Sequence, residues 1–426
     1  MENISSENTS ECVRATYVVE TNMKLEAFVQ KILQEQTIDV SDFGDLVRVP
    51  TCVEKCLGRL WNIVDIGQGN EHAVDGVGQQ AIIEIDFPMI NFDKTGGMPL
   101  LLAIVAGNVL ADRTAKKIRL LDVSIPSSLA ELFHGPRFGS QGIRQVLEES
   151  KEKRPFVGVI MRPSLGLDAA DYAKIAYEIA FSGADFIKDD EKFVNPIYCP
   201  YEQRIPLVRE ALDRAYKVTG KKTIYLANVT TRADKLVANA RKVVSLGSTG
   251  IMIDVMCVGI NAIEAVAEDS EVNVPIYGHR AGYAALGRSR DFGIDALVLL
   301  KLFRFAGVDM LSVGSLGGTH FERPVESSKY INAVRGSLGG KKPSLPVLIG
   351  GVHPAIVENN IRIYGKDVAF FCGGCVHGHP DGIRGGVKAM KQAVEAALAG
   401  VNVTDYAKDS KNKELHRALE AFGIKR

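Results

Sequence analysis

From residue 156 to about residue 400 the chain repeats one pattern, a short apolar segment followed by a longer amphipathic one. The apolar segments are often β-branched and hardly interrupted by polar residues, which is typical of parallel strands buried on both faces. They occur at residues 156–161, 185–188, 223–228, 250–255, 275–279, 309–313, 346–349 and 368–371. Helices are predicted between them, at residues 168–182, 202–219, 232–246, 260–268, 292–306 and 383–399. Eight strand–helix units within about 250 residues predict an α/β fold, a (βα)8 TIM barrel over residues 156–400.

The first part of the chain follows a different pattern. Predicted strands at residues 15–20, 46–49, 58–65, 80–87 and 118–125 are mixed with predicted helices at residues 24–34, 52–56 and 99–109. Such a mixture predicts a small N-terminal α+β domain, of the ferredoxin-like kind, over residues 12–133. We expect a linker and a short helix at residues 134–155, and a charged helical tail at residues 401–426.

Composition narrows the class of protein. With 426 residues the chain has room for a large barrel and a smaller domain. Lysine plus arginine and aspartate plus glutamate both total 51, so the charge balance predicts no nucleic-acid partner. No apolar run reaches the length of a membrane span, and the polar start of the chain resembles no signal or transit peptide. The seven cysteines have no disulfide-framework spacing, which predicts a cytoplasmic protein.

The second predicted strand of the barrel ends in four charged residues, Lys188-Asp189-Asp190-Glu191. Charge directly after a buried strand is costly unless it has a task, so we favour a functional site over a solvated charge run. Lys188 and Asp190 share one face because side chains alternate along a strand, and Glu191 follows where the loop opens. Carboxylate oxygens suit Mg²⁺. Lysine joins such a site as an oxygen ligand when CO2 carbamylates its neutral amine.

Other predicted strands end in residues that suit substrate binding, because TIM barrels place their chemistry at the carboxyl ends of the strands. The last two strands are followed by the glycine pairs Gly350–Gly351 and Gly373–Gly374. Their free backbone N–H groups predict a phosphate site, and the alternative is that they only make tight turns. His279 could be a core histidine, but its position beside Arg280 at a strand end favours an active-site acid or an anion contact.

The order of these motifs resembles the large subunit of ribulose-bisphosphate carboxylase, over most of the chain and most strongly from Gly135 onward. The resemblance implies a Mg²⁺ site formed by carbamylated Lys188, Asp190 and Glu191. It implies that His279 and Arg280 contact substrate and its phosphate, and that the two glycine pairs are phosphate loops. Asn108 resembles an asparagine that reaches the substrate of the partner subunit, which implies a homodimer with its active sites at the subunit interface.

Two departures from the carboxylase pattern bear on function. Where carboxylases have Lys-Pro-Lys after the first strand, this chain has Arg162-Pro163-Ser164, and arginine does not give up a proton in proteins. Where the loop after the sixth strand has a lysine that stabilises the nascent carboxylate, the aligned residue is Ser315, and a neutral hydroxyl cannot replace that charge. The chain therefore resembles a RuBisCO-like protein, the form of the family that does not fix CO2.

The resemblance implies a Mg²⁺-dependent lyase or isomerase that forms an enolate from a phosphorylated keto compound. We favour decarboxylation or carboxyl transfer on a β-keto-acid sugar phosphate, with Arg162 as a clamp for the substrate carboxylate and His279 as a proton donor. One alternative is an enolase or isomerase acting on a methylthio-ketose phosphate in methionine salvage. Another is a non-catalytic regulatory protein with a vestigial site.

Overall fold

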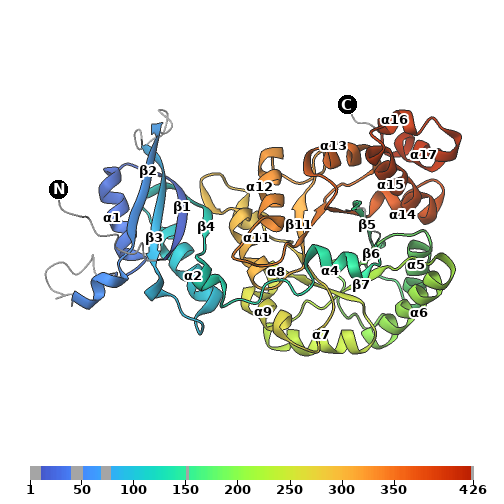
Figure 1. The fold of residues 1–426 in the computed structure, drawn as a ribbon, viewed down its shortest axis with the longest axis horizontal. Helices are drawn as coiled ribbons and strands as arrows, with labels where there is room; N and C mark the ends of the chain where they lie inside the picture. The colour runs from blue at the N-terminus through green and yellow to red at the C-terminus, as the bar shows by residue number, and fades with distance from the viewer. Residues whose placement is uncertain (1–10, 40–50, 69–77, 150–152, 424–426) are drawn as a thin grey trace. The chain divides into compact units, whose positions relative to one another are not determined.

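The computed structural model describes residues 11–39, 51–68, 78–149 and 153–423 (Figure 1). The chain folds into two compact units. The first is formed by residues 1–133 together with Gly282–Leu302, and the second by His134–Ala281 together with Phe303–Arg426. None of the described helices has the length and apolar composition needed to cross a bilayer.

The first unit is a sheet with a βαββαβ chain order. Its elements are β1 (Cys12–Thr21), α1 (Leu25–Glu35), β2 (Arg59–Gln68), β3 (Gln79–Pro88), α2 (Gly97–Ala106) and β4 (Ala115–Ser124). The strands lie in the order β4-β1-β3-β2, and neighbours in this set are antiparallel. Along β1 the residues Val13, Ala15, Tyr17 and Val19 are buried in alternation with more exposed ones, as expected when one face of a sheet is covered. This arrangement is ferredoxin-like, as predicted.

Short 3-10 helices connect these elements, η2 (Thr51–Cys56), η3 (Met89–Asn91) and η4 (Asn108–Ala111). The predicted helix at residues 99–109 is therefore two elements, because Gly107 leaves the helical conformation between α2 and η4. The predicted strand at residues 46–49 lies outside the described residues.

The second unit contains a closed barrel of eight parallel strands. They are β5 (Phe156–Ile160), β6 (Phe186–Lys188), β7 (Ile224–Asn228), β8 (Gly250–Asp254), β9 (Ile276–His279), β11 (Met310–Gly314), β12 (Leu345–Ile349) and β13 (Ala369–Cys372). Each strand pairs with its neighbour in the chain, and β13 pairs with β5 to close the barrel. The predicted TIM barrel is confirmed.

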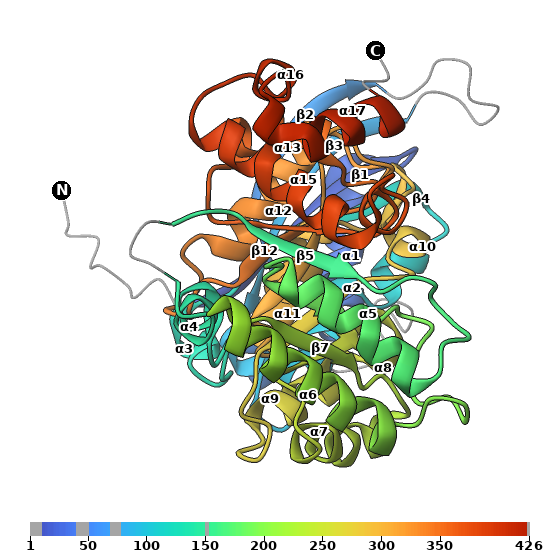
Figure 2. The same cartoon turned by 90° about the vertical axis from the view of Figure 1, so that its right-hand side faces the viewer.

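Helices surround these strands on the outside (Figures 1 and 2). The longer ones are α5 (Ala169–Phe181), α6 (Tyr201–Thr219), α7 (Leu236–Ser245), α9 (Ile260–Glu268), α12 (Pro324–Arg335), α13 (Pro354–Tyr364) and α15 (Gly382–Leu398). Shorter ones are α4 (Gly139–Val146), η5 (Ala233–Lys235), α8 (Val255–Val258), α14 (Gly374–His377), α16 (Val403–Tyr406) and η6 (Ser410–Asn412). The short helices α3 (Ser127–Ala130) and α10 (Ala284–Gly287) belong to the first unit. The chain continues through α17 (Lys413–Phe422).

The predicted helix at residues 292–306 is wrong in its first part. Residues Phe292–Ile294 form a strand, β10, which runs parallel to β4 at the edge of the first unit's sheet. Gly293 has a φ of +111°, a conformation that a right-handed helix does not contain. Helix α11 (Ala296–Phe305) begins only after this strand.

Aromatic side chains fill the interior of the barrel. Phe371 lies between Phe186 and Tyr277, with ring centroids 5.5 and 5.3 Å away, and Phe156 packs edge-on against Phe186. A side chain at Gly158 would reach within 2.3 Å of the Phe371 ring, so glycine at this strand position lets the ring fill the interior. These rings form an aromatic layer in the interior of the barrel.

Candidate active site

Lys188, the last residue of β6, is fully buried at the carboxyl end of the barrel. Its ammonium group donates a hydrogen bond to the carbonyl of Asp189 at 2.8 Å and lies 3.9 Å from a carboxylate oxygen of Glu191. Burial lowers the pKa of Lys188 to about 8, against the opposing effect of Glu191 and Asp190. A larger fraction of Lys188 is therefore in the neutral amine form than for an exposed lysine, and the neutral amine is the form that reacts with CO2.

Asp190 and Glu191 bring carboxylates to the same strand end. One oxygen of Asp190 accepts hydrogen bonds from Arg162 at 2.6 Å and Ser164 at 3.0 Å, and the other accepts the N–H of Lys192 at 3.2 Å. Burial acts to raise the pKa of Asp190, but the Lys192 N–H and the Arg162 charge outweigh it and lower the pKa. Asp190 is thus held as a carboxylate, as a ligand of a divalent cation must be.

Asp189 points away from this site and into a buried network. It accepts hydrogen bonds from the hydroxyls of Tyr172 and Tyr225, from Arg204 at 3.2 Å and from the N–H of Asn228 at 2.9 Å. Asp189 and Arg204 are both fully buried. Alternation along the strand explains the division, with one carboxylate facing the helices and its neighbours facing the barrel mouth.

His279 ends β9 on the other side of Lys188. Its Nε2 lies 3.9 Å from Glu191, and its Nδ1 lies 3.9 Å from Asp254 at the end of β8. Burial and the nearby Lys188 lower its pKa. Within the described part of the chain, Nδ1 of His279 and one carboxylate oxygen of Asp254 are buried polar atoms without a hydrogen-bond partner. Such atoms are costly in a folded protein and indicate a ligand-binding region.

The two glycine pairs lie at the ends of neighbouring strands. Gly350 and Gly351, after β12, have φ values of +91° and +68°, and a side chain on Gly350 would reach within 2.5 Å of the His320 ring. Gly373 and Gly374 follow β13. A Cβ atom on Gly373 would lie 3.7 Å from Nε of Arg162, whereas one on Gly374 would meet nothing within 4 Å.

A cavity of about 510 Å³ connects these groups. Its lining includes both glycine pairs and the side chains of Lys188, Glu191, Arg162 and His279. The structure thus brings together most of the predicted site residues of the barrel, although they come from five different strands.

Four predicted site residues do not line this cavity. Asp190 lies behind it, where its carboxylate accepts hydrogen bonds from Arg162 and Ser164. Arg280 is ion-paired with Glu322 at 2.6 Å, and both side chains are nearly buried. The Ser315 hydroxyl donates to the Gly350 carbonyl at 3.2 Å. Asn108 is the exposed first residue of η4 in the first unit, and its role toward a partner subunit stays a prediction.

The sequence interpretation missed His320 and His353, which also line the cavity, and Glu322. Burial lowers the pKa of both histidines. A signal for them was present, because a histidine and a glutamate follow the glycines after β11, and a histidine ends the Gly350–His353 turn. Titratable residues in loops at the carboxyl ends of barrel strands are candidates for substrate contact.

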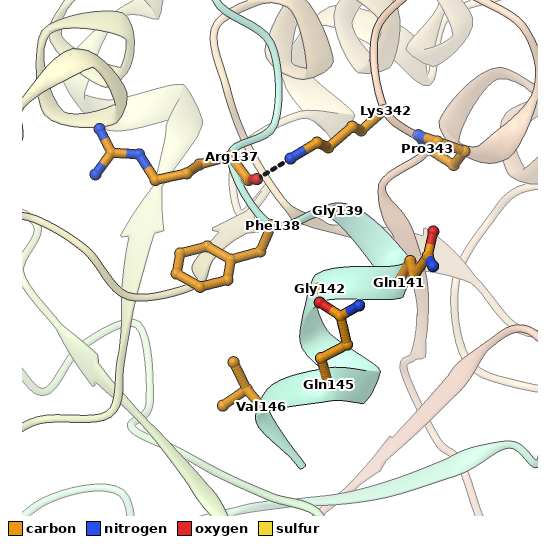
Figure 3. A pocket seen from close by; sticks show the side chains of 9 residues that line it. All are labelled: Arg137, Phe138, Gly139, Gln141, Gly142, Gln145, Val146, Lys342 and Pro343. Atoms are coloured by element: carbon orange, nitrogen blue, oxygen red, sulfur yellow. Dashed lines mark hydrogen bonds between the residues drawn. The ribbon is translucent and has the colours of Figure 1, made fainter. Parts of the chain in front are cut away.

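A second cavity, of about 550 Å³, is lined by residues that precede β5 and β12, including Arg137, Phe138 and Lys342 (Figure 3). The Lys342 ammonium donates to the backbone carbonyl of Arg137. The Arg137 guanidinium donates to the carbonyls of Ala267, Asp269 and Val272. Although slightly larger, this cavity lacks carboxylates and histidines in its lining, and we place the chemistry at the other end of the barrel.

Among the described residues, no three His, Cys, Asp or Glu side chains are grouped so that they alone could hold a metal ion. Asp190 and Glu191 provide two carboxylates, and a third oxygen ligand at this place would come from Lys188. The donor set therefore fits Mg²⁺ when Lys188 is carbamylated.

Two family models match the chain. The catalytic domain of the ribulose bisphosphate carboxylase large chain matches residues 140–422, and the N-terminal domain of the same protein matches residues 49–129. The chain belongs to the ribulose bisphosphate carboxylase large-chain family. A relative named ribulose bisphosphate carboxylase, from Methanocaldococcus jannaschii, is 35% identical over 398 residues, which cover 89% of this chain and 91% of the relative.

Solved structures of the family include both carboxylases and other proteins. The octameric ribulose-1,5-bisphosphate carboxylase/oxygenase from Pyrococcus horikoshii has a TM-score of 0.88 at 30% identity, covering 100% of this chain and 96% of that one. A rubisco-like protein from Alicyclobacillus acidocaldarius has a TM-score of 0.86 at 31% identity, covering 97% and 99%. Overall similarity does not separate the two kinds of protein, so the assignment of a reaction depends on individual residues.

Proposed function

We propose that this protein is a non-carboxylating, Mg²⁺-dependent member of the family that forms an enolate from a phosphorylated keto compound. The favoured reaction is decarboxylation or carboxyl transfer on a β-keto-acid sugar phosphate. The observation that most supports it is the position of Arg162, a permanent cation that lines the cavity beside Gly373 and at hydrogen-bond distance from Asp190.

Carbamylated Lys188, Asp190 and Glu191 would hold the Mg²⁺ ion. When bound, the ion polarises the substrate ketone and stabilises negative charge on the enolate oxygen. The backbone N–H groups of the two glycine pairs bind the phosphate, and Arg162 orients the substrate carboxylate. The aromatic layer of Phe371 and Tyr277 closes the cavity from the barrel interior.

Decarboxylation suits this set of residues because it needs no base. The bond between the carboxyl carbon and the α-carbon breaks, CO2 leaves, and the electron pair forms the enolate. A proton must then reach the α-carbon, and His279 is our candidate to deliver it, since it lies at the cavity wall between Glu191 and Asp254. Isomerisation would instead begin with removal of a carbon-bound proton, which Arg162 cannot accept.

The enolase or isomerase reaction on a methylthio-ketose phosphate is the second candidate. Lys188 supports it, because a carbamate on this buried residue could act as the base in place of the missing strand-end lysine. The two reactions give different products in deuterated water. We expect release of CO2 from a β-keto-acid sugar phosphate, whereas deuterium incorporation into a methylthio-ketose phosphate without any CO2 release would overturn the preference.

Arg162→Met provides a matched test of the carboxylate clamp. We expect a raised KM for the β-keto acid and little change in binding of a ketose phosphate that lacks the carboxylate, because only the first ligand uses the guanidinium. Equal weakening of both ligands would mean that Arg162 binds the shared phosphate instead.

We also propose that the protein does not fix CO2 on ribulose bisphosphate. Arg162 cannot exchange a proton, and the Ser315 hydroxyl donates to the Gly350 carbonyl and has no positive charge. Each such catalytic group contributes about 10²–10⁴-fold to rate, so the absence of both would cost several orders of magnitude. Labelled phosphoglycerate formed from labelled CO2 at ordinary enzyme rates would contradict this.

A cytoplasmic homodimer completes the proposal. The solved carboxylase from Hyperthermus butylicus, 32% identical to this chain, is dimeric, and the exposed position of Asn108 leaves it accessible to a second chain. The seven cysteines are all free thiols, which suits a reducing compartment. Sedimentation of the purified protein together with an Asn108→Ala variant tests the site at the interface, since the substitution should lower activity without changing the oligomeric state.

A further inference from the structure

An ion pair at the carboxyl end of the barrel links two neighbouring strands. Arg280 follows β9 and Glu322 lies in the loop after β11. Nη2 of Arg280 is 2.6 Å from Oε1 of Glu322, and the two side chains are only 8% and 2% exposed. Both are absent from the lining of the active-site cavity. This guanidinium therefore has a buried counter-charge that belongs to the protein itself.

The carboxylate of Glu322 lies near His320 and Gly314, and its Oε2 is a buried atom without a hydrogen-bond partner among the described residues. Oε2 lies 3.9 Å from Nδ1 of His320, the residue that stands between the ion pair and the cavity. A Cβ atom on Gly314 would lie only 3.3 Å from the same oxygen, so the glycine leaves room for the carboxylate. Separating a buried ion pair leaves two uncompensated charges, which is strongly unfavourable.

The distribution of charge around the cavity is uneven as a result. On the side of the Gly373–Gly374 pair, Arg162 lines the cavity and its side chain is 36% exposed, although Asp190 pairs with it at 2.6 Å. On the side of β9 and β11, the lining residues are His279 and His320, and neither is a permanent cation. On that side Arg280 lies outside the cavity lining, and Glu322 balances its charge.

We propose that Glu322 determines substrate specificity by withdrawing Arg280 from anion binding. The substrate then has one phosphate, bound at the glycine pairs, and a neutral or hydroxylated group at the His320 end. This inference rests on the proposed function only in taking the glycine pairs as the phosphate site, and it replaces the sequence-based prediction that Arg280 contacts an anion.

Titration calorimetry on the full-length protein tests this by measuring the affinities for ribulose 5-phosphate and ribulose 1,5-bisphosphate. The titrations contain Mg²⁺ and no bicarbonate. The wild type should bind both with affinities within about threefold, since the second phosphate meets no uncompensated cation. Glu322→Gln should bind the bisphosphate about tenfold or more tightly than the wild type does, because one charge-assisted contact becomes available. Glu395→Gln, which removes an exposed carboxylate on α15, is the matched control and should leave both affinities unchanged.

A wild type that binds the bisphosphate tenfold more tightly than the monophosphate would overturn the inference, as would a Glu322→Gln variant with no gain. If that variant does not fold, Arg280→Met/Glu322→Met replaces the pair by apolar side chains of similar length. Its affinity for the bisphosphate should match the wild type, and a tenfold loss would show that Arg280 binds the second phosphate after all.

The binding experiment can support or refute the role of Glu322 independently of whether the proposed reaction is correct. Equal binding of the two probes by a protein that releases no CO2 from any keto-acid phosphate would contradict the reaction and support this inference. Binding of neither probe would refute the phosphate site and the inference together, whatever the reaction.

Discussion

The two ends of the barrel have cavities of similar size, about 510 Å³ at the carboxyl ends of the strands and about 550 Å³ at the amino ends, but opposite chemistry. At the amino ends, Arg137 and Asp309 are hydrogen-bonded to the backbone, and other charged residues pair with each other, as Arg144 does with Asp367. Arg137 donates to three carbonyls, and Asp309 accepts the N–H groups of Phe138, Gly139 and Ile276. These contacts fasten the loops to the strands.

At the carboxyl ends, the polar side chains of Lys188, Glu191 and His279 line the cavity. His279 and Asp254 each keep a buried polar atom without a hydrogen-bond partner in the described structure, and Lys188 is buried beside Glu191. Groups of this kind reduce stability, and they persist where ligands and chemistry need them. The comparison teaches that the satisfaction of polar groups, and not the size of a cavity, locates function in this barrel.

The largest expected effect is on activity at the carboxyl end. Lys188→Ala removes the residue that would complete the metal ligands, so we expect a loss of at least about 10³-fold in kcat/KM. Prior incubation of the wild type with bicarbonate and Mg²⁺ should raise activity, and chelation of the metal should abolish it. Full activity in Lys188→Ala would exclude the proposed metal site.

The next effect is on stability, behind the same strand end. Asp189→Asn removes the counter-charge of fully buried Arg204, so we expect the free energy of unfolding in urea to fall by about 3–5 kcal/mol. Tyr172→Phe is the matched control, because it removes one neutral donor to Asp189 and should cost about 0.5–1.5 kcal/mol. Similar losses in the two variants would mean that the charge of Asp189 is unimportant.

At the amino end, Asp309→Asn should affect stability and leave activity per folded molecule unchanged. The amide has one acceptor oxygen for three N–H donors, so we expect a loss of about 1–3 kcal/mol. A changed KM for substrate in this variant would contradict the separation of the two ends.

The same residue predicts a pH dependence. Burial raises the pKa of Asp309 from 3.8 to about 6, although three N–H groups act to lower it. Between these values the folded protein binds a proton that the unfolded chain has released, so this contribution to stability is lost as the pH rises from about 4 to 6. The stability difference between wild type and Asp309→Asn should therefore be largest near pH 4. If the stability difference between the two proteins instead grows toward pH 7, the pKa of Asp309 is lowered in the folded protein and the prediction is wrong.

The smallest effect is expected for Lys342→Ala, also at the amino end. Its ammonium is exposed and donates to one backbone carbonyl, so we expect a change in stability within about 0.5 kcal/mol and no change in kcat/KM. It is the control for Lys188→Ala, since each removes one lysine from a cavity wall of the barrel. A large loss of activity in Lys342→Ala would place part of the chemistry at the amino end.

The barrel and the centre of its site could be predicted from the sequence because their signals are local. Short apolar runs such as residues 223–228 and 250–255 are strands because nothing in them suits an exposed face. Asp189 faces away from Lys188 and Asp190 because side chains alternate along a strand. The glycine pairs indicate the loops after β12 and β13. Each of these features depends on residues a few positions apart.

What the tertiary structure decided depends on residues that are far apart in the chain. Phe292–Ile294 is a strand because β4, from a distant part of the sequence, offers a sheet edge, and no periodicity within residues 292–306 shows this. Glu322 meets Arg280 only because β9 and β11 are neighbours in the closed barrel. Ion pairs between strand ends depend on barrel closure and side-chain conformation, whereas strand and turn patterns depend on local sterics and hydrophobic burial. The sequence alone therefore determined where the site lies, and the folded chain decided which of its charges remain available to a ligand.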